Sequence, residues 1–170
     1  MIPYEYWTLK RSCMTDQIEI RKAVDHDADH LSQLIRENAE ALLRPHYNEK
    51  QWSVFMKYYS PEQLRRKISG QDVFCAERDG KIVGTIALDA DFVVGFYTRL
   101  HDLNKGIGKV MMKHLEEFAL QKGLTEIQLA ASPEGLTFYH KNGWTKIKEI
   151  VMEHYGVGFE ETLMRKRLIQ

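Results

Sequence analysis

Hydrophobic and polar positions along the chain first predict a strand and then a long helix. Residues 18–21 alternate between apolar and polar side chains, which is the spacing of a short strand. Apolar residues then recur at helical spacing between 31 and 42. Asp25 is the expected N-cap of this helix, and Pro45 lies beyond its end.

Two further helices are predicted before the pattern changes. One covers 49–59, a stretch with several aromatic residues. The other begins at Ser60 and Pro61, which are favoured at the N-cap and at the first helical position.

Beyond residue 72 the pattern is that of strands. Apolar runs at 73–77 and 82–88 flank the dipeptide Asp79-Gly80, which is typical of a two-residue hairpin turn. Residues 89–91 form a second tight link, into a strand over 92–98. Consecutive antiparallel strands are therefore expected in this part of the chain.

The remaining elements complete a mixed fold. In chain order we expect a helix ended by Gly123, a strand over 124–130, a short helix from Ser132 to Asn142-Gly143, and strands over 145–152 and 161–168 around a loop at 154–158. This order predicts an α/β (α+β) fold in which helices flank a mixed, mostly antiparallel sheet of about six to seven strands.

The length of the chain predicts one domain, and its charge gives no indication of nucleic-acid binding. With 170 residues we expect a single domain over 18–170, preceded by an aromatic-rich appendage over 1–17. Lys plus Arg equals Asp plus Glu at 24 each, so no net field favours nucleic acid. The densest basic run, 165–167, is expected to be a solvated edge strand.

Cysteine usage and hydropathy indicate a cytoplasmic protein without a membrane partner. No apolar stretch approaches the about 18 residues of a membrane span, and the N-terminus lacks the pattern of a secretory signal. Cys13 and Cys75 form no CxxC motif, and Cys75 lies in an apolar run, so a reduced core residue is expected there.

A glycine loop between strand and helix is the first candidate for ligand binding. Gly106 and Gly108 allow backbone to approach a ligand, and the helix that follows offers unpaired N–H groups suited to a pyrophosphate. Lys105 and Lys109 add positive charge. Neither the Walker A motif nor the GxGxxG dinucleotide motif fits, because Val110 and Met111 stand at required positions. A tight turn without a ligand is the alternative.

A second motif, FYHKNGW over 138–144, follows the glycine loop along the chain. Together with LNKGIG over 103–108, it resembles the GCN5-related N-acetyltransferase (GNAT) family, whose motifs are [Q/R]xxGxG/A after a strand and a later FYxxxGF-like segment. The predicted order of elements also matches this family over 18–168.

The resemblance implies an acyl-CoA N-acyltransferase-like fold and transfer of acetyl from acetyl-CoA to a primary amine, without a metal. Strand 96–98 would splay from strand 124–130, and its backbone would pair with the pantetheine arm. Loop 104–109 would hold the pyrophosphate. The coenzyme-binding residues implied in this way are Phe96, Tyr97, Thr98, Asn104, Lys105, Gly106, Ile107, Gly108, Lys109 and Ser132.

Tyr139 matches the family's tyrosine near the thioester sulfur, where it would act as a general acid to the leaving thiolate. A core tyrosine with a satisfied hydroxyl is the alternative. The amine would attack the thioester directly in a ternary complex, with a backbone N–H near the developing oxyanion. A catalytically silent acyl-CoA sensor is the alternative function, and a homodimer is a fold-level expectation.

The chain departs from the family pattern at three positions. Leu103 replaces the usual Gln or Arg, and Asn104 stands where glycine is common, although Asn tolerates positive φ. Phe92 falls where some members carry a glutamate base. The base is left open among Glu77, Asp89, Asp91 and His101, each of which is also explained as a surface or turn residue.

Three further features have two readings each. His26 and His30 have the spacing of a zinc pair, but a solvated helix start explains them as well. Aromatic residues fall where the family forms its acceptor wall, and helix packing explains them equally; they are Tyr47, Trp52, Phe55, Tyr58 and Tyr59. His154 and Tyr155 either edge the acceptor cleft or belong to a plain loop. The acceptor is expected to be a small molecule or a peptide.

Overall fold

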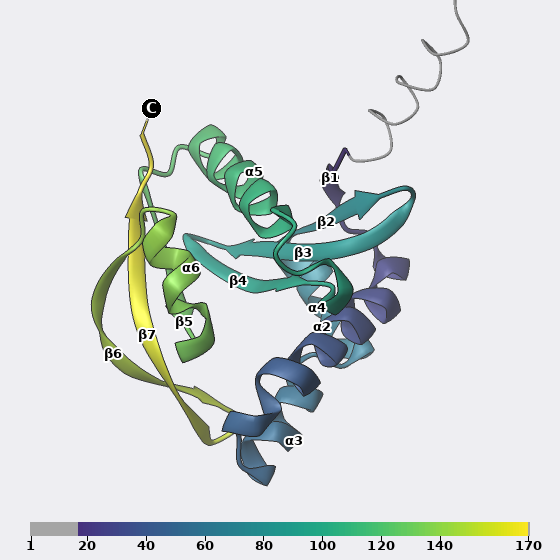
Figure 1. The fold of residues 1–170 in the computed structure, drawn as a ribbon, viewed down its shortest axis with the longest axis vertical. Coiled ribbons are helices and arrows are strands. Elements are labelled where there is room, and N and C mark those ends of the chain that lie inside the picture. Colours follow the sequence, from purple (N-terminus) through teal and green to yellow (C-terminus); the bar gives the residue numbers. More distant parts are fainter. Residues whose placement is uncertain (1–16, 170) are drawn as a thin grey trace, which may run out of the picture.

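A computed structural model of the chain describes residues 17–169, and the expected appendage over 1–17 lies almost entirely outside them. Seven strands form one sheet in the order β1-β2-β3-β4-β5-β7-β6 (Figure 1). All neighbours are antiparallel except β4 and β5. The strands are β1 (Glu19–Lys22), β2 (Asp72–Arg78), β3 (Lys81–Asp89), β4 (Phe92–Thr98), β5 (Glu126–Ala131), β6 (Thr145–His154) and β7 (Val157–Arg167).

Five α-helices flank the sheet within the described residues, which confirms the predicted fold class. They are α2 (Ala28–Leu42), α3 (Glu49–Tyr58), α4 (Pro61–Gly70), α5 (Ile107–Gln121) and α6 (Leu136–Lys141). Short 3-10 turns connect several of them: η1 (Asp25–Asp27), η2 (Arg44–His46), η3 (Leu100–Asp102) and η4 (Pro133–Gly135).

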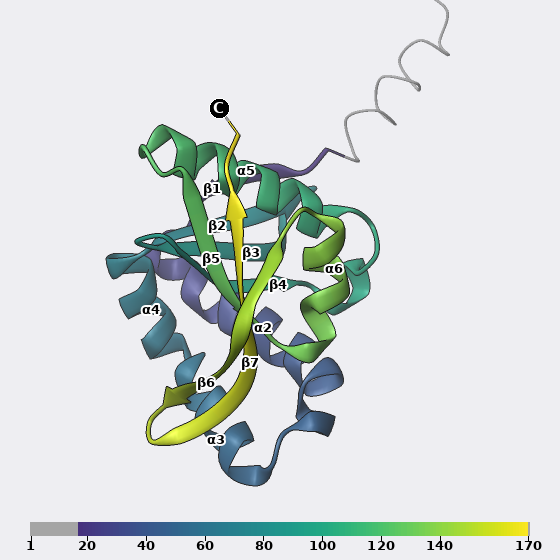
Figure 2. The same cartoon turned by 90° about the vertical axis from the view of Figure 1, so that its left-hand side faces the viewer.

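Helices cover both faces of the first half of the sheet (Figures 1 and 2). On one face Met111 and Leu115 of α5 are fully buried in a core that includes Phe74 of β2. On the other face α2, α3 and α4 pack on a second core, which includes the buried free thiol of Cys75 as predicted. Adjacent residues of β2 therefore serve opposite cores, as the two-residue period of a strand requires.

Strands β4 and β5 part soon after they meet. Their parallel pairing is restricted to Phe92 and Gln128, so the predicted splay is present. On its other side, β4 carries a bulge where its register with β3 shifts, and Gly95 lies there with φ of 55°. Such a bulge locally interrupts the ladder and bends the strand. A space therefore opens beside the middle of β4.

The two-residue turn of the first hairpin was predicted correctly. Asp79 and Gly80 have φ values of 53° and 72°, as a type I′ turn requires. The last loop was predicted too long: β6 continues to His154, and a two-residue turn at Tyr155 and Gly156 leads into β7. The loop was predicted too long because β6 and β7 stay paired beyond the residues in which the sequence alternates between apolar and polar.

Two other predictions are wrong. Asp25 lies in a 3-10 turn rather than at the N-cap of α2; it is Asp27 that accepts the Val24 N–H at 2.8 Å and binds Arg21. The basic run 165–167 is not on an edge strand, since β7 lies between β5 and β6. Lys166 is paired there with Glu116 at 2.6 Å.

Candidate active site

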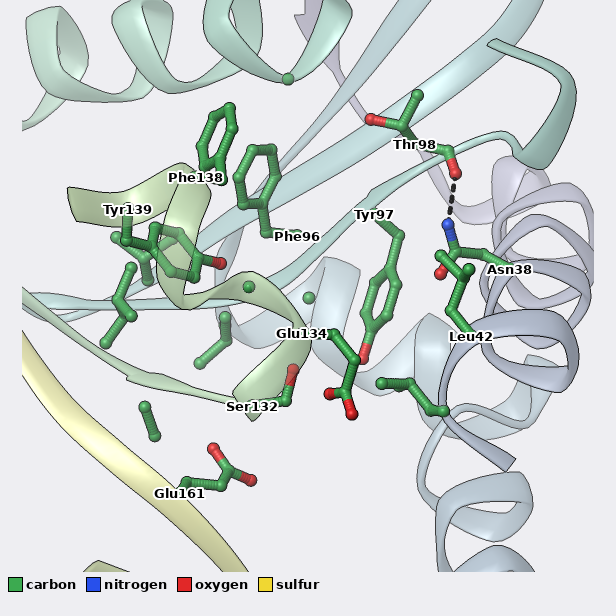
Figure 3. A pocket seen from close by; sticks show the side chains of 18 of the residues that line it. Asn38, Leu42, Phe96, Tyr97, Thr98, Ser132, Glu134, Phe138, Tyr139 and Glu161 are labelled. Carbon is green, nitrogen blue, oxygen red and sulfur yellow. Dashed lines mark hydrogen bonds between the residues drawn. The ribbon is translucent and has the colours of Figure 1, made fainter. Parts of the chain in front are cut away.

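A cavity of about 610 Å³ opens where β4 and β5 part (Figure 3). Most of the residues expected to bind the coenzyme, and Tyr139, line it, although they come from four separate elements. They are Phe96, Tyr97, Thr98, Asn104, Gly106, Ile107, Gly108, Lys109, Ser132 and Tyr139. Lys105 is the one member of the predicted set that does not line this cavity.

The glycine loop presents the start of α5 to the cavity. Asn104 and Gly106 have φ values of 60° and 80°, so each adopts the left-handed conformation that Asn tolerates and Gly prefers. Gly106 is the N-cap of α5 and supplies no side-chain hydrogen bond to it. The first-turn N–H groups of a helix have no intrahelical partner, and its dipole favours an anion there. This end of the cavity is therefore suited to a phosphate.

At Gly108 the constraint comes from packing rather than from the backbone angle. A Cβ at this position would lie 3.3 Å from Cζ of Phe96 and 3.6 Å from the Phe138 ring. The two rings also lie against each other, with centroids 5.7 Å apart. The absence of a side chain thus lets α5 approach both β4 and the aromatic motif over 138–144.

A buried carboxylate anchors the base of the loop. The side chain of Asp102 is only 1% exposed and forms ion pairs with Arg78 and Arg99. Nζ of Lys105 lies 3.5 Å from Oδ1 of Asp102, and the lysine side chain is 52% exposed. Burial opposes ionisation of Asp102, but the hydrogen bond from Arg99 and the nearby positive charges outweigh it and lower its pKa.

Tyr139 enters the cavity from α6 (Figure 3). Its ring packs against Trp144, with centroids 5.9 Å apart, and against the first core. Among the described residues, none forms a hydrogen bond with its hydroxyl. Burial, helped by the negative charge of Glu161, raises the pKa of Tyr139 well above that of a free tyrosine. The phenol is therefore protonated at neutral pH and able to donate.

Successive side chains of β4 point to opposite sides. Phe96 faces Phe138, whereas the Tyr97 ring packs edge-on to Tyr59 at 5.4 Å. At the end of the strand, Nδ2 of Asn38 donates to the Thr98 carbonyl at 2.8 Å (Figure 3). Asn38 thus holds the end of β4, whose pairing with β5 is restricted to Phe92 and Gln128.

The far end of the cavity is aromatic and includes a carboxylate. Trp52, Phe55 and Tyr59 are buried in the second core, as helix packing predicts, whereas Tyr47 and Tyr58 are partly buried. Three of these aromatic residues, Tyr47, Tyr58 and Tyr59, line the cavity. Residues of the sheet complete this end; they are Asp89, Met152, His154 and Glu161.

Glu161 is the residue that the sequence reasoning missed. It projects from β7 into the cavity, and burial raises its pKa to about 7. A signal was present in the sequence, because Phe159 and Glu161 alternate with polar neighbours in the last strand. Phe159 is buried and Glu160 is exposed, so Phe159 and Glu161 share the inward face.

The four candidate bases named from the sequence are placed differently. Glu77 accepts a hydrogen bond from Nε of Arg21 at 2.9 Å, on β2. Asp91 accepts from Nε2 of Gln128 at 3.3 Å, and His101 is exposed in η3. Asp89 alone of the four lines the cavity, from an exposed position at the end of β3.

Among the described residues, no three His, Cys, Asp or Glu side chains gather in a way that could hold a metal ion. His26 and His30 thus have no third ligand in that part of the chain. Within the same residues, no helix has both the length and the apolar character needed to cross a membrane.

Comparison with known proteins gives one family and one fold. A model described as the acetyltransferase (GNAT) domain matches residues 43–168. A GCN5-related N-acetyltransferase from Rhodopseudomonas palustris is similar with a TM-score of 0.81 and 22% identity, over 88% of this chain and 95% of its own.

Two further solved structures share this fold. PaiA N-acetyltransferase from Thermoplasma acidophilum, in complex with coenzyme A, has a TM-score of 0.74 and 24% identity over 89% of this chain and 99% of its own. A spermidine N-acetyltransferase chimera from Vibrio cholerae and hSSAT has a TM-score of 0.64 and 14% identity, over 89% and 96%.

Proposed function

Because the chain belongs to the acetyltransferase (GNAT) family, we propose that it transfers the acetyl group of acetyl-CoA to a primary amine. The observation that carries this proposal is the cavity between β4 and β5, which has an uncapped helix start at one end and the Tyr139 phenol beside it. The acceptor is a small molecule or the amine of a peptide. The structure of PaiA N-acetyltransferase with coenzyme A supports the choice of coenzyme.

In this proposal the coenzyme binds through backbone. The N–H groups at the start of α5 and the loop of Asn104 and Gly106 hold the pyrophosphate, and Lys109 adds charge. The pantetheine arm runs along the open edge of β4 from Phe96 to Thr98 in the manner of an added strand. Ser132, at the end of β5, faces this arm. Lys105, whose Nζ lies 3.5 Å from Oδ1 of Asp102, adds positive charge at the loop.

The chemistry proposed is direct attack in a ternary complex. The amine nitrogen adds to the thioester carbonyl, and backbone N–H groups at the bulge near Gly95 stabilise the oxyanion. When the carbon–sulfur bond breaks, Tyr139 protonates the sulfur. Its raised pKa keeps the proton available at neutral pH. Holding both substrates together supplies much of the rate.

Calorimetric titration of acetyl-CoA tests the position of the coenzyme. Gly108→Glu places a side chain against Phe96 and a negative charge at the helix start, so we expect its affinity to fall by at least about 100-fold. Val110→Glu is the matched control: Val110 is 41% exposed on the same helix and does not line the cavity. Equal affinity in wild type and Gly108→Glu would contradict the placement.

A thiol-release assay over a panel of primary amines tests the reaction. Acetyl-CoA-dependent release of thiol with at least one amine is expected of the wild type. If the wild type binds acetyl-CoA but turns over no amine, the chain is a sensor of the coenzyme rather than an enzyme. If acetyl-CoA does not bind, the proposed function is overturned.

A further inference from the structure

Glu161 lines the cavity but has no role in the reaction as proposed above. The side chain extends from β7 into the cavity, at the end away from the glycine loop (Figure 3). It also borders a smaller recess of about 70 Å³ lined by Tyr47, Val54, Phe55, Tyr58, Tyr59, Tyr97, His154 and Phe159. The carboxylate is thus at the junction of the cavity with an aromatic chamber.

No cation neutralises this carboxylate among the described residues. Neither a hydrogen bond nor an ion pair joins Glu161 to another side chain of residues 17–169, whereas the glutamates at 77, 116 and 134 each have a basic partner. A half-buried carboxylate without a partner is costly to ionise. Ionisation of Glu161 becomes favourable when a ligand brings positive charge next to the carboxylate.

Glu161 is the one carboxylate among the residues that line the aromatic chamber. Tyrosines surround it from the η2–α3 connection, α3, β4 and α6, and burial raises the pKa of each; they are Tyr47, Tyr58, Tyr59, Tyr97 and Tyr139. They stay neutral at physiological pH.

Three other charged or titratable groups lie toward this end of the cavity, whereas Asp102 and Lys109 line it at the glycine loop. Burial, helped by the charge of Lys67, lowers the pKa of His154. Glu134 lies on η4, with Oε1 3.4 Å from Nε2 of His46. Asp89 is exposed at the cavity mouth.

We infer that Glu161 is the catalytic base that removes a proton from the acceptor, and that the acceptor is an alkyl primary amine that arrives as an ammonium ion. This inference rests on the proposed function, whose amine it narrows. The aromatic chamber suits the alkyl part and the cation, because ring faces attract positive charge. The carboxylate suits the N–H groups of the ammonium.

The proton balance of the step is complete. One ammonium proton passes to the Glu161 carboxylate, and the freed lone pair forms the bond from nitrogen to the carbonyl carbon. The carbon–sulfur bond then breaks with its electrons on sulfur, which takes the Tyr139 proton. The excess proton on the amide nitrogen returns to the Tyr139 oxygen, and Glu161 releases its proton to water. Amide, free thiol and one proton are the products.

The test compares Glu161→Gln with Glu160→Gln. Both remove one negative charge from β7, but Glu160 is exposed and faces away from the cavity. With an alkylamine acceptor at pH 7, we expect Glu161→Gln to lower kcat/KM by about 100-fold or more and Glu160→Gln to leave it unchanged. Calorimetric affinity for acetyl-CoA should stay the same in both variants.

The pH profile separates a catalytic base from a structural role. In the wild type, kcat/KM should rise with pH through about 7 as Glu161 ionises, and then level off. In Glu161→Gln this inflection should disappear, and activity should recover as the pH approaches the pKa of the free amine. His154→Gln should keep the inflection, because His154 is not the group that produces it.

The outcomes distinguish this inference from the proposed function. If the wild type acetylates an alkylamine and Glu161→Gln matches it in rate and pH profile, Glu161 is not the base and the inference fails alone. If Glu161→Gln is slow at every pH without recovery, the residue is structural and the inference also fails. Absence of acetyl-CoA binding or turnover in the wild type would overturn the proposed function itself.

Discussion

The two ends of the cavity are built in different ways. The end at which we place the coenzyme, called the coenzyme end, comes from nearly continuous chain, β4 and the loop into α5; the other end, at which we place the amine, is called the acceptor end. The acceptor end takes single side chains from distant elements, such as Tyr47 before α3, His154 on β6 and Glu161 on β7. A constant ligand can be held by the shape of a backbone, whereas a variable acceptor is selected by side chains that can change without disturbing the fold.

Tyr139 lies between the two ends, so its loss should affect the reaction and neither binding step. Tyr139→Phe removes the proton donor but keeps the ring that packs on Trp144. We expect kcat to fall by about 100-fold, the contribution typical of a positioned general acid. Steady-state kinetics with acetyl-CoA and an alkylamine, together with calorimetric titration of acetyl-CoA, would measure this.

Tyr155→Phe is the control for this change, because Tyr155 is 50% exposed at the hairpin turn and does not line the cavity. Unchanged turnover in Tyr139→Phe would show that the thiolate leaves without the help of this phenol. A weaker affinity for acetyl-CoA in this variant would instead assign Tyr139 to the coenzyme end.

The contrast between the two ends also explains what the sequence could predict. The turn at Asp79-Gly80 and the loop at Asn104 and Gly106 were expected correctly, because positive φ is a local demand met by few residue types. The aromatic motif over 138–144 was also found at the cavity. Each of these features depends on residues that are adjacent in the sequence.

Features decided by distant partners were less predictable. The inward face of β7 is visible in the alternation of Phe159 and Glu161, but that it meets a cavity depends on β4 and β5 parting after Phe92. In the same way, the charge of the buried Asp102 is balanced by Arg78, which is 24 residues away in the sequence. No periodicity in the sequence reports either fact.

Asp102 offers a way to disturb the coenzyme end alone. Asp102→Asn keeps the shape of the side chain but leaves Arg78 and Arg99 without their counter-charge. These guanidinium groups are partly exposed and can recover some hydration, so we expect a loss of about 2 kcal/mol in the free energy of unfolding. Urea denaturation at pH 7 would measure it. Weaker binding of acetyl-CoA with an unchanged KM for the amine should accompany it.

The sign of the pH dependence provides a check on this change. Because the pKa of Asp102 is lowered in the folded state, its stabilisation is present above the ordinary aspartate pKa and is lost as the pH falls through the lower folded value. The stability difference between wild type and Asp102→Asn should therefore shrink below about pH 4. Glu40→Gln, which breaks an exposed pair with Arg44, should cost less than about 1 kcal/mol.

The smallest effect is expected at the acceptor end, from the ring of Tyr58. This ring lines the cavity, packs on His154 with centroids 4.7 Å apart, and has Nζ of Lys67 3.5 Å from its centroid. Tyr58→Leu removes the aromatic face, so the KM of an alkylamine should rise by about 5-fold, equivalent to about 1 kcal/mol. Tyr58→Phe keeps the face and loses only the hydroxyl, so it should resemble the wild type. An equal rise in both variants would attribute acceptor binding to the hydroxyl, and a change in acetyl-CoA affinity would show that the two ends of the cavity are not independent.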